Sequence, residues 1–98
     1  MQRPSPESSP LGLIGLGLLG SVLAERLLAG GFAVTGFDID SARLEAFRQL
    51  GGEPANAAGA VFARCSRVVL SLPSHREVAA LVHESAAGLR PGAMIIDT

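Results

Sequence analysis

Three glycines near the start of the chain constrain its fold more than any other feature. Gly15, Gly17 and Gly20 form the pattern G-x-G-x-x-G. The residues before them, 11–14 (LGLI), are a short apolar run of the kind found in strands buried in parallel sheets. The residues after them, 18–29, repeat apolar side chains at helical spacing and are followed by two glycines that predict a helix end. The pattern therefore lies between a strand and a helix, which is the structural context in which it indicates a dinucleotide-binding turn.

Each glycine has its own expected role in such a turn. Gly15 permits the tight turn, Gly17 lets the backbone approach a pyrophosphate, and Gly20 lets the helix and the strand pack closely. The free N–H groups and the helix dipole, equivalent to about half a positive charge, would hold the phosphates without a lysine. The alternative interpretation is that the three glycines only ease a buried turn.

Asp38 favours the binding interpretation. It ends a second predicted strand over residues 32–37 (FAVTGF), where a carboxylate can accept hydrogen bonds from the adenosine ribose hydroxyls of a dinucleotide. A carboxylate about 4 Å from a 2′-phosphate would be repelled by roughly 1–4 kcal/mol, so NAD is favoured over NADP. Ile39, not an arginine, follows Asp38, but Arg43 lies one helical turn further on and leaves NADP open.

Strands and helices alternate along the rest of the chain. A helix from about residue 41, with Asp40 or Ser41 as its N-cap, should end at Gly51 and Gly52. The further expected elements are a minor strand near 53–55, a short helix over 55–63, a strand over 67–72 ended by Pro73, a helix over 74–87 with a Ser74/Glu77 capping box, and a strand over 93–97. This order predicts an α/β Rossmann-type parallel sheet with helices on both faces and strand order 3-2-1-4-5.

The composition fits one domain that begins after a Pro- and Ser-rich leader, residues 1–10, which we expect to be flexible. Eight basic and nine acidic side chains nearly cancel, and no basic face indicates nucleic acid. Cys65 is the single cysteine, so we expect a small buried hydrophobe, no disulfide and no metal site. His75 and His83 are expected on the surface.

The apolar stretch 11–24 has some features of a signal peptide or a membrane span. Four glycines interrupt it, and it is shorter than the about 20 apolar residues that a span requires. We therefore expect no membrane contact and a cytoplasmic location.

Four motifs occur in the order found in a known family: residues 13–20 (LIGLGLLG), 36–38 (GFD), 70–73 (LSLP) and 91–97 (PGAMIID). With them the chain resembles, over residues 11–98, the β-hydroxyacid dehydrogenases, which include 3-hydroxyisobutyrate dehydrogenase and are related to 6-phosphogluconate dehydrogenase. The resemblance implies an NAD(P)-dependent oxidoreductase that transfers a hydride between nicotinamide and a small 3-hydroxy acid.

The resemblance also implies site residues. The loop from Leu16 to Leu19 would cover the pyrophosphate, and Leu72 and Pro73 would line the cofactor cleft, although this pair could also be a plain strand end. The full expected cofactor-binding set is Gly15, Leu16, Gly17, Leu18, Leu19, Gly20, Asp38, Leu72 and Pro73. Leu19 replaces the methionine usual in the family. Glu77 stands near the place of an asparagine that contacts the cofactor in some relatives, and we assign it to the capping box.

The family's catalytic lysine belongs to a helical domain that follows the strand ending at Asp97. This chain contains no lysine, so we expect no catalytic residue within it and no activity from these residues alone. We favour an N-terminal piece of a dehydrogenase, whose helical domain would complete the site for a hydroxyacid substrate and could support a homo-oligomer. The alternatives are a Rossmann scaffold or interaction domain without activity and, less favoured, an S-adenosylmethionine-dependent methyltransferase.

Overall fold

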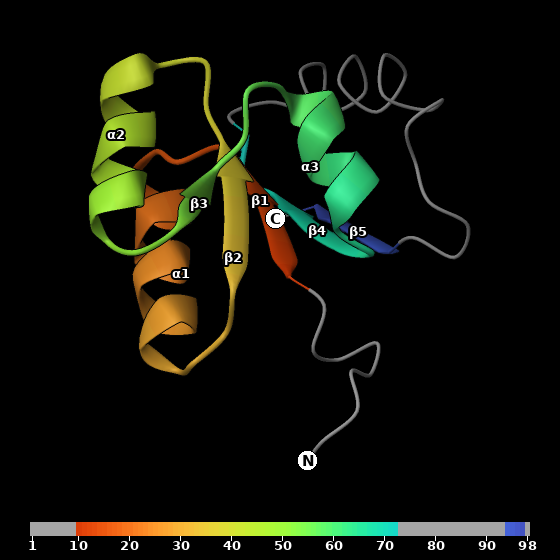
Figure 1. Ribbon diagram of the computed structural model, residues 1–98, viewed down its shortest axis with the longest axis horizontal. Coiled ribbons are helices and arrows are strands. Elements are labelled where there is room, and N and C mark those ends of the chain that lie inside the picture. Colours follow the sequence, from red (N-terminus) through yellow and green to blue (C-terminus); the bar gives the residue numbers. More distant parts are fainter. Residues whose placement is uncertain (1–9, 73–93, 98) are drawn as a thin grey trace.

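The apolar run after residue 10 forms the central strand of a parallel sheet (Figure 1). The computed structural model describes residues 10–72 and 94–97. Within them, five strands pair in the order β3-β2-β1-β4-β5, which confirms the predicted fold class and strand order. The strands are β1 (Leu11–Ile14), β2 (Val34–Phe37), β3 (Glu53–Pro54), β4 (Arg67–Leu70) and β5 (Met94–Asp97), and the helices are α1 (Leu18–Ala29), α2 (Ser41–Gln49) and α3 (Ala58–Arg64).

Successive side chains of β1 face opposite sides of the sheet. Leu13 belongs to a buried cluster with Ala24 of α1 and Phe47 of α2, whereas Ile14 belongs to a second cluster with Val61 of α3. The helices α1 and α2 therefore cover one face of the sheet and α3 covers the other, as Figure 1 shows. Cys65 is fully buried in the second cluster, which confirms its expected role as a small core residue.

The helix α1 has the bounds that its periodicity predicts, and the strand after it begins later than predicted. The N–H of Phe32 donates to the carbonyl of Leu27 (3.0 Å), so residues 30–32 complete the end of α1 and pairing starts only at Val34. Gly31 has a φ of 91°, the left-handed conformation expected after a helix.

The predicted helix over 55–63 is wrong at its start, because Ala55 continues the minor strand predicted near 53–55, which the structure confirms as β3. The N–H of Ala55 donates to the carbonyl of Gly36 (2.8 Å), and α3 begins three residues later at Ala58. The fourth strand ends at Leu70, before the predicted 72, and the fifth begins at Met94. The predicted leader, Pro73, the helix over 74–87 with Ser74 and Glu77, and both histidines lie outside the described residues.

Asp40, and not Ser41, caps α2. Its Oδ1 accepts hydrogen bonds from the N–H groups of Ala42 (2.9 Å) and Arg43 (3.4 Å). No helix within residues 10–72 is long and apolar enough to cross a membrane.

Asp40→Ala should lower the free energy of unfolding by about 0.5–2 kcal/mol, since it removes the acceptor for two N–H groups of the first turn. Urea denaturation measures the change. Ser41→Ala is the matched control, and a loss of stability there as large as that of Asp40→Ala would contradict the assignment of the cap.

Candidate functional site

The turn that contains the three glycines, residues 15–20 (the glycine turn), lies at the carboxyl edge of the sheet. The N–H of Gly15 donates to the carbonyl of Phe37 at the end of β2 (3.0 Å), and the N–H of Ser71 after β4 donates to the carbonyl of Ile14 (2.8 Å). The chain runs outward from β1 to β2 and β3 on one side, then crosses to β4 and β5 on the other. Ligands of open parallel sheets bind at this kind of switch point.

Gly15 and Gly20 are required by the fold itself. Gly15 has a φ of 98°, and a Cβ there would overlap the carbonyl oxygen of Ser71. A Cβ at Gly20 would overlap the carbonyl oxygen of Gly15, because α1 packs directly against the turn that precedes it. Both glycines thus have structural reasons that do not involve a ligand.

Gly17 is different, because the fold of the described residues does not need a glycine there. Its backbone is extended, with a φ of −70° and a ψ of −156°, so its φ is not in the left-handed region that favours glycine. The nearest atom to a Cβ at this position would be Nη1 of Arg43, at 3.6 Å, an ordinary van der Waals distance. The absence of a side chain leaves space beside the backbone at the start of α1.

The amino end of α1 presents N–H groups toward that space. Gly17 is the N-cap and has no side chain to accept from them, and the first turn contains no acidic residue. The first N–H that bonds back along the helix is that of Ser21, to the carbonyl of Gly17 (2.8 Å). The N–H groups of the first turn, together with the dipole of a 12-residue helix, make this end attractive to an anion.

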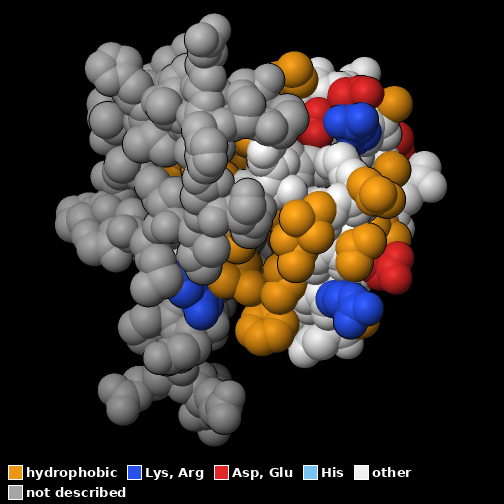
Figure 2. Space-filling view, turned by 180° about the vertical axis from the view of Figure 1, so that it is seen from behind, with side chains coloured by type: hydrophobic (Ala, Val, Ile, Leu, Met, Phe, Trp, Pro, Cys, Tyr) orange, Lys and Arg blue, Asp and Glu red, His pale blue; other side chains and the backbone are white. Residues whose placement is uncertain are grey.

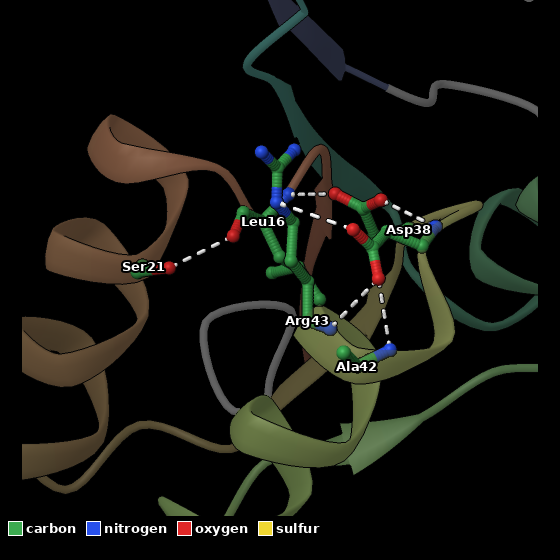
Figure 3. Close-up of polar contacts among 6 residues, drawn as sticks. Leu16, Ser21, Asp38, Ala42 and Arg43 are labelled. Carbon is green, nitrogen blue, oxygen red and sulfur yellow. Dashed lines mark hydrogen bonds and ion pairs between the residues drawn. The ribbon is translucent and has the colours of Figure 1, made fainter.

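Asp38 lies beside the glycine turn, directly after β2. Its Oδ2 accepts a hydrogen bond from the N–H of Leu16 (2.7 Å), and its Oδ1 accepts one from the N–H of Asp40 (2.8 Å), as Figure 3 shows. Each carboxylate oxygen has a further lone pair, so ribose hydroxyls can still be accepted. The contact with Leu16 joins residues 22 positions apart and was not predicted from the sequence.

Arg43 brings a positive charge to the same place. Its side chain reaches from α2 toward the glycine turn (Figure 3), with Nε 3.8 Å from Oδ2 of Asp40. The guanidinium is close to Gly17, as the 3.6 Å distance above indicates. A carboxylate and a guanidinium therefore flank the start of α1, and they have opposite effects on a nearby phosphate.

Exposed apolar side chains surround these polar groups. Leu18 is 89% exposed and Leu19 53%, both at the start of α1, and Ile39 next to Asp38 is 93% exposed. Figure 2 shows hydrophobic side chains gathered on one face of the described part of the molecule. Apolar walls around a few polar groups are typical of small-molecule sites.

The structure brings most of the predicted site residues together. The six residues of the glycine turn and Asp38 meet at the carboxyl edge of the sheet, and Leu72 packs beside them, with its Cδ2 3.2 Å from where a Cβ of Gly15 would be. Pro73 lies outside the described residues. Within residues 10–72, no cluster of three or more His, Cys, Asp or Glu side chains could hold a metal ion.

Sequence reasoning did not single out Ser21. Its hydroxyl donates to the carbonyl of Leu16 (2.8 Å), so it supports the glycine turn from within α1. The sequence did not identify it, because a serine in a helix can either point to solvent or bond back to a preceding carbonyl, and the choice depends on the folded turn.

The comparisons with known proteins agree with this geometry. A family model described as the NAD-binding domain of 6-phosphogluconate dehydrogenase matches residues 10–98. The L-threonate dehydrogenase of Cupriavidus necator is 30% identical over 92 residues, which cover 91% of this chain and 31% of that protein. The chain thus spans about a third of the length of this relative.

Solved structures show the same fold. The 3-hydroxyisobutyrate dehydrogenase of Mycobacterium tuberculosis, solved with L-serine, matches with a TM-score of 0.87 and 25% identity over 91% of this chain and 31% of that one. An imine reductase variant from Myxococcus stipitatus in complex with NAD+ matches with a TM-score of 0.84 and 25% identity, over the same shares of both chains.

Proposed function

The chain belongs to the family of 6-phosphogluconate dehydrogenase NAD-binding domains, and from this premise we propose that its glycine turn and Asp38 hold NAD. The pyrophosphate lies at the amino end of α1 beside Gly17, and the adenosine ribose lies at Asp38. The observation that carries the proposal is the space at Gly17, since a glycine that the packing of residues 10–72 does not require is best explained by a ligand that approaches its backbone. Leu18, Leu19 and Leu72 complete the walls of the cleft.

We propose NAD as the preferred cofactor over NADP. Asp38 already accepts two backbone hydrogen bonds, which fix the position of its carboxylate, so a 2′-phosphate next to it would be repelled. Arg43 reduces this repulsion, because its guanidinium lies close to the same end of α1. We therefore expect weak but measurable binding of NADP.

For the whole protein we propose hydride transfer between nicotinamide and the hydroxyl-bearing carbon of a small hydroxy acid. The names of the L-threonate and 3-hydroxyisobutyrate dehydrogenases support a hydroxyacid substrate. When bound, the cofactor supplies the hydride chemistry, and the residues described here bind and orient it. We further propose that the helical domain of the whole protein supplies the catalytic residue, completes the substrate site and forms any oligomer interface. We also propose that the whole protein is cytoplasmic.

Titration with NADH, followed by cofactor fluorescence, tests the proposal. We expect saturable binding below millimolar cofactor, and Asp38→Ala should weaken it about 10-fold or more because hydrogen bonds to a charged group are lost. S-adenosylmethionine serves as the control ligand and should not bind. No binding of NADH at millimolar concentration, or tighter binding of S-adenosylmethionine, would contradict the proposal.

A further inference from the structure

Both polar backbone groups of Leu16, in the middle of the glycine turn, are held by side chains. Its N–H donates to Oδ2 of Asp38 (2.7 Å), and its carbonyl accepts from the hydroxyl of Ser21 (2.8 Å), as Figure 3 shows. Its own side chain is 2% exposed and packs against the cluster of Leu13 and Phe47. Leu16 is therefore fixed at its N–H, at its carbonyl and at its side chain.

The two side chains that hold Leu16 come from different elements. Ser21 is in α1, and Asp38 follows β2 and also accepts the N–H of Asp40, which caps α2. Leu16 is thus the point at which the starts of α1 and α2 and the end of β2 are linked. The N–H of Leu16 is bonded to Asp38, so the N–H groups that a phosphate can use are those further along the turn.

We propose that Ser21 and Asp38 are positioning residues that fix the Leu16 backbone and so form the phosphate-binding end of α1 before the cofactor arrives. A turn that is already ordered does not lose its conformational entropy on binding, and this increases the affinity. Asp38 then has two functions, since it also accepts the ribose hydroxyls. The affinity part of this inference rests on the proposed function of the site.

A variant of Ser21 tests positioning without changing ribose recognition, because the Ser21 hydroxyl bonds to Leu16 in the phosphate-binding turn. NAD and NADP both place their pyrophosphate at this turn. Ser21→Ala should weaken NAD and NADP by the same factor, about 3- to 10-fold, since one hydrogen bond is lost. Ser21→Thr keeps the hydroxyl and should restore binding to within about twofold. The matched control is Ser66→Ala, which precedes β4 at the opposite edge of the sheet. All titrations are made well below the melting temperature, where each variant is folded.

A second measurement needs no cofactor. Amide hydrogen exchange at Leu16, whose N–H is bonded to Asp38, should be faster in the ligand-free Ser21→Ala and Asp38→Ala proteins than in the wild type, and unchanged in Ser66→Ala. Asp38→Ala should also lower the melting temperature by about 5–10 °C, because the N–H groups of Leu16 and Asp40 lose their acceptor.

The two proposals fail in different ways. If the wild type binds no dinucleotide, the proposed function fails, and the exchange and melting measurements still test the positioning roles. Wild-type affinity and wild-type exchange in Ser21→Ala, or a loss of affinity confined to NAD, would overturn the role of Ser21. An unchanged melting temperature in Asp38→Ala would overturn its positioning role.

Discussion

Gly20→Ala is expected to unfold the domain. The added Cβ would overlap the carbonyl oxygen of Gly15, a backbone atom that cannot rotate away as a flexible side chain could. Gly15 cannot move away from the added Cβ either, because its left-handed backbone (φ of 98°) and the neighbouring carbonyl of Ser71 fix the turn. Overpacking commonly costs about 1–3 kcal/mol, and contact with rigid backbone on both sides should raise the cost to a large part of the about 5–15 kcal/mol that stabilises a typical domain.

Circular dichroism and urea denaturation measure this loss. The chain offers a matched control in Gly59→Ala, because Gly59 lies in α3 and a Cβ there meets no atom of the described residues within 4 Å. Alanine is the better helix former, so this control should be as stable as the wild type or up to about 1 kcal/mol more stable. A Gly20→Ala protein with wild-type stability would show that α1 does not pack on the turn as described.

Gly17→Ala is expected to give a folded protein that binds its cofactor much more weakly. Its φ is negative and its backbone extended, and among the described residues the added Cβ would make an ordinary contact, at 3.6 Å, with Nη1 of Arg43. In the complex the same methyl group would occupy the space through which the pyrophosphate approaches the start of α1. A misfit of about 1–3 kcal/mol corresponds to a loss of affinity of about 5- to 150-fold.

NADH titration and urea denaturation of the same Gly17→Ala sample separate the two effects. The expected result is a wild-type free energy of unfolding together with weakened binding. Wild-type affinity would mean that the pyrophosphate lies elsewhere. An unfolded variant would mean that the fold itself requires glycine at this position, and the observation that carries the proposed function would then be lost.

The three glycines show how far the motif could be interpreted before the structure was known. The sequence predicted a tight turn at Gly15, close packing at Gly20 and phosphate approach at Gly17. The structure confirms the first two reasons, as the φ of Gly15 and the overlap at Gly20 demonstrate. Within the part of the chain that the structure describes, Gly17 has no comparable structural reason, which makes the third role testable apart from folding.

The errors in element bounds have a common cause. Phe32 and Ala55 both have residue types that suit the predicted element, yet their N–H groups bond elsewhere. Phe32 closes the end of α1 on Leu27, and Ala55 bonds to Gly36 of β2. Residue preference describes the chain near a position, whereas these bonds depend on which carbonyl the folded chain brings within reach.

Local pattern accounts for the architecture of this protein. Alternating apolar periods, the glycines that end α1 and α2, and the glycine turn between β1 and α1 are properties of neighbouring residues, and they were sufficient for the strand order and for a dinucleotide as the expected ligand. Asp38 could be assigned to the ribose for the same reason, since it directly follows a strand.

The arrangement within the site came from packing alone. The bond from Leu16 to Asp38, the hydroxyl of Ser21 on the same residue, and the approach of Arg43 to Gly17 all depend on how the sheet aligns the ends of β1 and β2 and how α1 and α2 lie on it. Hydrogen bonds act over about 3 Å, so a contact between residues 22 apart in the chain exists only once the fold has brought them together.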